Sequence, residues 1–285
     1  MKVGIYVNIN RDIKCETAIK FIDILSKKNV EILLIKGAEQ YINMPSYSLE
    51  EVAGIADMLI VFGGDGTMLS IARRVVKNDI ALLGVNKGRL GFLTECEDEN
   101  LQVVVDRLIT NDFYVEERTM LKIVIGNKSY LALNEVSLSR LMSKRTIDVS
   151  ITIDGGLCDI VTGDGVIVST PTGSTAYAMS CGGAILSPEV KAIGVTAICP
   201  HSLNSRPMVV CDESSICLKV NNCKPSDIVV CIDGESVDLE ENELVVTIEK
   251  SVNTTKLIRL NNKNFYSKLI HKMSGWNKLG SNDKL

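Results

Sequence analysis

The first third of the chain alternates short apolar segments with segments of helical periodicity, and this alternation is the strongest constraint on its fold. The expected strands are residues 3–7, 30–35, 58–62 and 80–85. The expected helices are residues 13–28, 68–76 and 101–108. Because the strands are apolar throughout, both faces of their sheet must be covered, which is typical of a parallel sheet with helices on either side.

From about Tyr114 the pattern changes to short strands alone. The expected strands are residues 121–125, 129–137, 147–153, 157–162, 166–169, 195–199, 215–220, 227–232, 244–248 and 256–260. The pairs Gly126-Asn127, Asp154-Gly155 and Asp233-Gly234 are typical of turns between them. We therefore expect an α/β domain with a mostly parallel sheet over residues 1–115, and a β-rich, sandwich-like domain over 116–262. Residues 263–285 are expected to form a C-terminal helix, over 265–271, that returns to the first domain, and a tail.

The composition narrows the function classes. A chain of 285 residues with 46% hydrophobic residues can bury a sizeable core. Its net charge of −4 and the lack of a basic run argue against a nucleic-acid partner. The N-terminus has no signal-peptide pattern and no apolar run approaches the roughly 20 residues of a membrane span, so we expect a cytoplasmic protein without a membrane partner.

Nine cysteines lack any C-x-x-C pair and are accompanied by only two histidines. This pattern argues against a zinc site and against a disulfide framework. We expect reduced, mostly buried thiols, and we assign no residue as a protein ligand of a metal.

The stretch Gly63-Gly64-Asp65-Gly66-Thr67 lies where the third strand would lead into a helix. Glycines let the backbone approach a bound group, and free N–H groups at a helix N-terminus favour anions. Gly63, Gly64, Gly66 and Thr67 are therefore candidates for binding phosphate. The alternative is a tight strand–helix turn in which Asp65 or Thr67 is the N-cap.

The chain has neither a P-loop motif nor the dinucleotide fingerprint G-x-G-x-x-G. A carboxylate inside a phosphate site would repel the ligand unless it had a task. Asp65 could accept a proton from an attacking hydroxyl, or it could organise Mg²⁺ beside the phosphates.

The motif GGDGT occurs in phosphofructokinases, in diacylglycerol and sphingosine kinases and in NAD kinases. Four further stretches of this chain separate these families: GVNKGRLGFLTE from Gly84, NEV from Asn134, TGDGVIVSTPTGSTAY from Thr162 and ICPHSLNSRP from Ile198. Together with GGDGT they span residues 63 to 207, and in this order they resemble the NAD kinase family of the bacterial type.

The resemblance implies phosphorylation of the 2′-hydroxyl of the adenosine ribose of NAD by ATP, with Mg²⁺ or another divalent cation. It implies that Asp65 is the general base, that Asn134 and Glu135 bind the adenine and a ribose hydroxyl, and that Asp164 binds the nicotinamide end. The full set implied to bind NAD is Asp65, Gly66, Asn134, Glu135, Arg145, Asp164, Thr175, Ala176, Tyr177 and Ser180. Members of the family are oligomers, so we expect a homotetramer or a homodimer.

Simpler interpretations stay open at this stage. Asn134 and Glu135 could be a polar pair at a strand end, Asp164 a turn residue between glycines, and Tyr177 a core residue of a short helix. Thr162 and Glu235 depart from the residues that relatives often carry, namely a basic residue and a glutamine. For the whole chain, the alternatives are a lipid kinase of the diacylglycerol type and a non-catalytic dinucleotide-binding protein.

Overall fold

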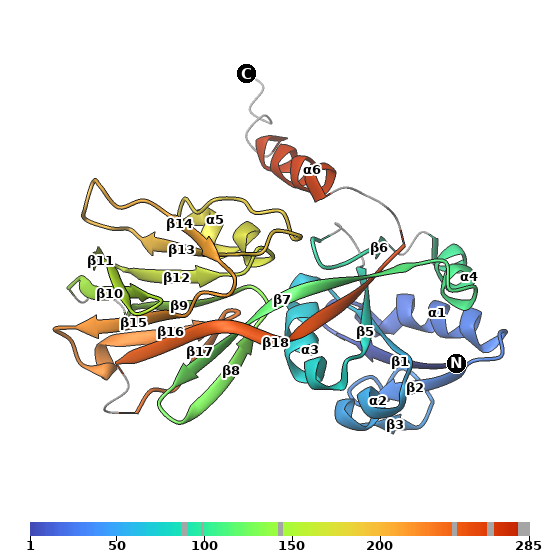
Figure 1. Cartoon of the computed structure of the whole chain (residues 1–285). Coiled ribbons are helices and arrows are strands. Elements are labelled where there is room, and N and C mark those ends of the chain that lie inside the picture. The colour runs from blue at the N-terminus through green and yellow to red at the C-terminus, as the bar shows by residue number, and fades with distance from the viewer. Residues whose placement is uncertain (87–90, 98–99, 142–144, 241–243, 261–264, 279–285) are drawn as a thin grey trace, which may run out of the picture. The chain divides into compact units, whose positions relative to one another are not determined.

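The structure, a computed structural model, describes residues 1–86, 91–97, 100–141, 145–240, 244–260 and 265–278 (Figure 1). The chain divides into two compact units. Unit 1 consists of residues 1–117 and 256–285, and unit 2 consists of residues 118–255. The domain boundaries expected from the sequence pattern lie after residues 115 and 262.

Unit 1 is built on a parallel sheet in the order β5-β4-β1-β2-β3. The strands are β1 (Lys2–Val7), β2 (Glu31–Ile35), β3 (Ser46–Tyr47), β4 (Met58–Phe62) and β5 (Ala81–Asn86). All five residues of β4 are buried, as its uninterrupted apolar sequence predicts. Beyond β5, the last part of β18 (Val245–Arg259) adds a further parallel strand through Lys256 and Leu257, and the short β6 (Cys96–Glu97) pairs with the end of β5.

The helices of unit 1 are α1 (Glu16–Ser26), α2 (Leu49–Ile55), α3 (Asp65–Val75), α4 (Leu101–Ile109) and α6 (Phe265–Lys278). The expected C-terminal helix thus belongs to unit 1, as predicted. The sequence prediction omitted α2, although Ser48 and Glu51 form a capping box at its start. The prediction also began α3 at residue 68, three residues too late, because the glycines at 64 and 66 obscure its first turn.

Unit 2 consists of two antiparallel β layers that share one apolar core. The first sheet has the order β14-β13-β12-β9-β16-β17. Its strands are β9 (Glu135–Arg140), β12 (Gly165–Ser169), β13 (Ala192–Ile198), β14 (Met208–Cys211), β16 (Ile228–Ile232) and β17 (Glu235–Val237). The second layer contains β7 (Tyr114–Ile125), β8 (Lys128–Ala132), β10 (Ile147–Ile153), β11 (Gly156–Gly163), β15 (Ile216–Asn221) and the first part of β18. The sandwich-like prediction is confirmed.

Two strand predictions in this region are wrong. The expected strand 129–137 is interrupted at Leu133 and Asn134, so that β8 and β9 enter different sheets. Conversely, the expected strands 244–248 and 256–260 are one strand, β18, which runs from unit 2 into unit 1. The polar residues in its middle resemble a loop in the sequence.

The cysteines are all free thiols, but the expectation that most are buried is wrong. Only Cys15 and Cys96 are buried, whereas Cys158, Cys199 and Cys211 are exposed and the other four are intermediate. Several lie on alternating strand positions that face away from the core, which the apolar character of cysteine does not reveal.

Candidate active site

The glycine-rich loop follows β4, which lies between β1 and β5 in the sheet. The N–H of Gly63 donates to the carbonyl of Val85, and α3 begins at Asp65 with Gly64 as its N-cap. The N-cap is thus Gly64, which has no side chain, so the alternative in which Asp65 or Thr67 is the N-cap is wrong. Thr67 instead accepts a hydrogen bond from Asn8 through its hydroxyl, at 2.8 Å.

The glycines of this loop are not all needed by the fold. A Cβ at Gly63 would meet the side chain of Thr67 at 2.5–2.8 Å. At Gly66 an added Cβ would meet nothing within 4 Å, and at Gly64 it would meet only Asn86 Oδ1, at 4.0 Å. Neither residue has a positive φ. Since packing and backbone strain require glycine at neither position, a ligand that approaches the backbone closely would account for these two glycines.

Asp65 lies at the first turn of α3, and its carboxylate accepts hydrogen bonds from the segment that follows β5. Oδ2 accepts from the N–H of Phe92 at 2.9 Å, and Oδ1 accepts from the N–H groups of Leu93 and Thr94 at 3.1 and 3.3 Å. Lys272 of α6 lies 3.4 Å from Oδ2. A side chain at Gly91 would overlap the carboxylate, so this approach requires a glycine there.

In unit 2, Asn134 and Glu135 lie at the interruption between β8 and β9. Asp233 fixes this interruption, because its carboxylate accepts from the N–H groups of Leu133, Asn134 and Glu135 at 2.9, 2.7 and 3.1 Å. Asp233 has φ 48° and Gly234 has φ 83°, so the predicted turn exists and also serves as an anchor. The sequence suggested the turn but not this contact, which joins residues about 100 positions apart.

Glu135 is 8% exposed, and its buried Oε2 has no hydrogen-bond partner among the residues that the structure describes. Burial, reinforced by the charge of Asp233, raises the pKa of Glu135 to about 8. A buried acceptor without a donor costs free energy in the free protein, and a ligand hydroxyl or amide would satisfy it. The simpler interpretation of a polar pair at a strand end does not explain why this oxygen is kept unsatisfied.

The segment 170–180 packs directly against Asn134. Thr170 donates from its N–H to the carbonyl of Asn134 and from its hydroxyl to that of Leu133, at 2.8 and 2.6 Å. Gly173 approaches so closely that a Cβ would collide with the backbone of Asn134. The structure therefore brings together two of the sequence motifs, NEV and PTGST, within unit 2.

The residues after this turn are accessible. Tyr177, in the short helix α5 (Tyr177–Ser180), is 45% exposed, so its interpretation as a core residue is wrong. Ser180 is exposed, Ala176 is half-buried, and Thr175 donates from its hydroxyl to the carbonyl of Thr172. Burial raises the pKa of the Tyr177 phenol, with smaller contributions from Cys181, Cys199 and Asp164.

Asp164 lies between β11 and β12 and pairs with Arg140, whose Nε is 2.6 Å from Oδ1. The sequence did not identify Arg140, because it lies at the end of a neighbouring strand. Gly163 and Gly165 are needed by packing, since side chains there would collide with the backbones of residues 198–200 and 138–139. Arg145 is exposed. Thr162, one of the departures, donates to Asp148, and Glu235, the other, begins β17 and is exposed.

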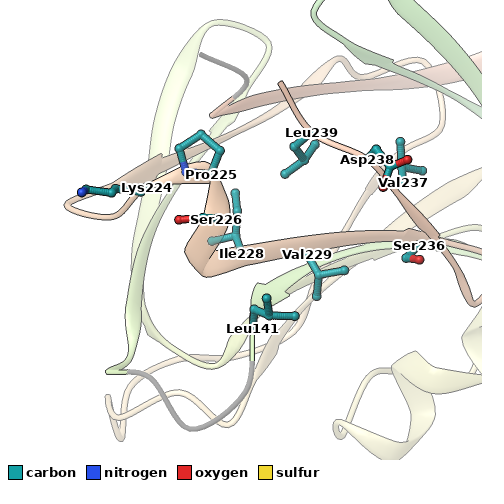
Figure 2. A pocket seen from close by; sticks show the side chains of 10 residues that line it. All are labelled: Leu141, Lys224, Pro225, Ser226, Ile228, Val229, Ser236, Val237, Asp238 and Leu239. Carbon is teal, nitrogen blue, oxygen red and sulfur yellow. The ribbon is translucent and has the colours of Figure 1, made fainter. Parts of the chain in front are cut away.

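A pocket of about 590 Å³ lies elsewhere on unit 2, and none of the expected site residues lines it. Its walls come from the end of β9, the turn before β16, and β16 and β17 with the residues that follow (Figure 2). In the described part of the chain, no group of three or more histidine, cysteine, aspartate or glutamate residues could hold a metal ion. Among the same residues, no helix has the length and apolar character to cross a membrane.

An open glycine loop after a central parallel strand, with a carboxylate at the first turn of the next helix, is typical of α/β units that bind phosphate groups. Joined to a β unit with a buried, unsatisfied carboxylate, it indicates a nucleotide-dependent phosphotransferase. Residues 3–113 match the family model described as the ATP-NAD kinase N-terminal domain, and residues 133–260 match that of the ATP-NAD kinase C-terminal domain. The chain therefore belongs to the NAD kinase family.

Individual relatives agree along almost the whole length. The NAD kinase of Caldicellulosiruptor saccharolyticus is 33% identical over 273 residues, which cover 96% of this chain and 99% of that protein. The NAD kinase of Bacteroides fragilis is 35% identical over 284 residues, with 96% and 97% covered. Because both family models are of ATP-NAD kinases, the alternative of a diacylglycerol-type lipid kinase is not favoured.

Solved structures agree as well. The yeast NADH kinase complexed with NADH matches with a TM-score of 0.86 at 25% identity, covering 100% of this chain and 89% of that one. An NAD kinase from Archaeoglobus fulgidus in complex with ATP matches with a TM-score of 0.74 at 28% identity, covering 95% and 98%.

Proposed function

We propose that this protein transfers the γ-phosphoryl group of ATP to the 2′-hydroxyl of the adenosine ribose of NAD⁺, giving NADP⁺ and ADP. The observation that carries the proposal is the open backbone at Gly64 and Gly66 beside the carboxylate of Asp65. Phosphate oxygens fit this backbone, and a carboxylate is tolerated there only if it takes part in the reaction.

In the proposed reaction, the 2′-oxygen forms a bond to the γ-phosphorus while the bond from that phosphorus to the β–γ bridging oxygen breaks. Asp65 accepts the proton of the hydroxyl, and ADP leaves with the negative charge. The N–H groups of Gly64 and Gly66 would hold the phosphates at the positive end of α3. Gly63 and Thr67, the other two expected phosphate-binding residues, would only shape the loop, because their N–H groups already donate to the carbonyls of Val85 and Gly64.

Unit 2 would bind the dinucleotide. Oε2 of Glu135 would accept from a ribose hydroxyl, and Asn134 would pair with the adenine edge, because an amide offers both a donor and an acceptor. Asp164 would accept a hydrogen bond from the carboxamide NH₂ of nicotinamide, through lone pairs that its contact with Arg140 does not use. Tyr177 would offer its accessible ring, while Arg145, Thr175, Ala176 and Ser180 would line the rest of the site.

Magnesium enters the proposal as the ion of MgATP. Mg²⁺ commonly keeps several waters and is bound by substrate phosphates with one or two carboxylates. One carboxylate of this kind, that of Asp65, lies at the first turn of α3 beside Gly64 and Gly66. Bound to the phosphates, Mg²⁺ would neutralise charge on the transferred group.

The first test is an assay with purified protein, ATP, Mg²⁺ and NAD⁺, coupled to an NADP⁺-specific readout. Turnover is expected, and NAD⁺ binding without turnover would instead support a non-catalytic dinucleotide-binding protein. Replacing NAD⁺ by diacylglycerol tests the lipid kinase alternative in the same experiment.

The change Asp65→Asn should leave the Kd for NAD⁺ within a few-fold and lower kcat by about 10²–10⁴-fold, because the hydroxyl loses its proton acceptor. The matched control is Asp106→Asn, which removes an exposed carboxylate of α4 that pairs with Lys28. Near-normal kcat in Asp65→Asn would contradict the assignment.

Two broader features complete the proposal. A cytoplasmic location suits nine free thiols, which persist in a reducing compartment. We also propose that the protein is a homotetramer or a homodimer, a state that light scattering coupled to size-exclusion chromatography measures directly.

A further inference from the structure

The carboxylate of Asp65 is fully occupied among the described residues. Two donors reach Oδ2, the N–H of Phe92 and the ammonium of Lys272, and two reach Oδ1, the N–H groups of Leu93 and Thr94. An ionised carboxylate offers about four lone-pair sites. A substrate hydroxyl can therefore reach Asp65 only if one of these four donors leaves.

The three backbone donors are held firmly in place. Arg259, only 3% exposed, donates to the carbonyls of Phe92 and Leu93 at 3.1 and 3.2 Å. The same guanidinium pairs with the buried Glu95 at 3.2 Å and with Glu116 at 2.6 Å. Moving the segment 92–94 would break this buried network, which is costly because charges would lose their partners away from water.

Lys272 is the one donor of the four that can leave without disturbing buried groups. Its contact with Asp65 is the longest, at 3.4 Å, and its side chain is 33% exposed. Its second contact is a cation–π interaction, 4.3 Å from the centre of the Phe92 ring. Partly exposed contacts of both kinds contribute little, about 1 kcal/mol each, and the lysine stem is flexible.

Contacts other than that of Lys272 hold α6 in its place. Lys268, one helical turn earlier, is 3.0 Å from Glu95 with only 10% of its side chain exposed. Phe265 packs on Phe92 with ring centres 5.8 Å apart. Positions 268 and 272 share one face of the helix, so one lysine anchors α6 while the other lies beside Asp65.

We propose that Lys272 is an exchangeable partner of Asp65 that binds the donor phosphate during the reaction. The acceptor hydroxyl takes its place on Oδ2, and the displaced ammonium moves to an oxygen of the γ-phosphate. This inference rests on the proposed function, which places the acceptor hydroxyl at Asp65 and the phosphates at Gly64 and Gly66. It adds α6, a helix that carries none of the residues implied by the sequence motifs, to the phosphate-binding site.

The test is the change Lys272→Gln, with ATP and NAD⁺ binding measured separately by calorimetry. The exchange predicts effects of opposite sign: the Kd for MgATP rises about 10-fold or more, since one charge-assisted contact is lost, while the Kd for NAD⁺ is unchanged or falls, since its competitor is gone. Lys272→Arg keeps the charge and should recover most of the MgATP affinity. The control Lys20→Met removes an exposed charge on α1 and should change neither Kd.

A purely structural lysine would give a different pattern, with a lower melting temperature and weaker binding of both nucleotides. That result, or a Kd for MgATP within twofold of wild type, would overturn the proposal. Failure of the proposed function is distinguishable, because wild-type protein would then bind NAD⁺ and MgATP without producing NADP⁺, or would not bind NAD⁺ at all.

Discussion

At the scale of single residues, the carboxylates of Asp65 and Glu135 have opposite surroundings and different proposed roles, one in the reaction and one in ligand binding. Within the described part of the chain, four donors reach the carboxylate of Asp65, whereas Oε2 of Glu135 is buried and receives none. The first is suited to exchange one donor for a reacting hydroxyl. The second is suited to gain a donor when a ligand binds, and until then it holds a proton at neutral pH because its pKa is raised to about 8.

Glu135 should make the folded state lose stability as the pH rises. The pKa of its carboxyl is raised from 4.5 to about 8 by burial and by Asp233, so between these values the folded state holds a proton that the unfolded state has released. The contribution of Glu135 to the free energy of unfolding therefore falls from pH 4.5 to pH 8 and is level outside this window. Glu135→Gln should remove this pH dependence. Between pH 4.5 and pH 8, the free energy of unfolding of the variant should therefore rise by roughly 2–5 kcal/mol relative to that of wild type.

Urea titrations at pH 5, 6.5 and 8, followed by circular dichroism without nucleotide, measure this difference. Other titrating groups are common to both proteins and cancel. A difference between Glu135→Gln and wild type that is constant with pH would mean that Glu135 is ionised in the folded protein.

At the scale of elements, helix stability and phosphate binding favour different residues in the loop 63–67 and at the start of α3. A helix interior favours alanine over glycine, and an added Cβ at Gly66 would meet open space. Retaining glycine at this position therefore costs helix stability, and the proposed phosphate site accounts for that cost. Gly63 differs, because a Cβ there would collide with the side chain of Thr67, so packing within the fold requires glycine at this position.

Gly66→Ala should consequently change stability and affinity in opposite directions. The melting temperature should be unchanged or higher, with a gain of up to about 1 kcal/mol from helix propensity. The Kd for MgATP should rise about 10-fold or more, because the methyl group keeps a phosphate from the N–H groups. Calorimetry and thermal unfolding of the same samples measure both effects.

Gly54→Ala is the matched control, since Gly54 lies in α2 and an added Cβ there also meets nothing within 4 Å. It should give the same stabilisation and leave ATP binding unchanged. An unchanged Kd for MgATP in Gly66→Ala would contradict the proposal that this loop binds the phosphates.

At the scale of the whole molecule, the two units differ in the number of chain segments that form them. Unit 2 is one continuous segment whose apolar core lies entirely within residues 118–255. Unit 1 needs two segments, because Ile258 and Leu260 complete its core and Arg259 holds Glu95 and Glu116.

A fragment of residues 118–255 should therefore fold by itself, with a cooperative urea transition and dispersed amide signals in NMR. A fragment of residues 1–117 should show neither, since it lacks the buried side chains and the strand that β18 supplies beside β5. A cooperative transition in the 1–117 fragment, or its absence in 118–255, would contradict this division.

How far the sequence predicts the structure depends on the range of the contacts. The strand Met58–Phe62 and the loop after it were predictable because their signals, an apolar run and closely spaced glycines, are local. The anchor at Asp233 and the contact between Lys272 and Asp65 join residues about 100 and 200 positions apart, which no local pattern reveals. The roles given to the predicted binding residues, such as Asn134 and Tyr177, stay predictions.

The passage of β18 from one unit to the other sets an order of events during synthesis. Strand β5 ends at Asn86, yet its neighbour in β18 begins at Lys256, about 170 residues later. At about 5–20 residues per second, one edge of β5 therefore stays unpaired in the nascent chain for roughly 9–34 s, and a chaperone could bind it in that time. The second unit can meanwhile close around its own core, so the half that is translated first is the half that matures last.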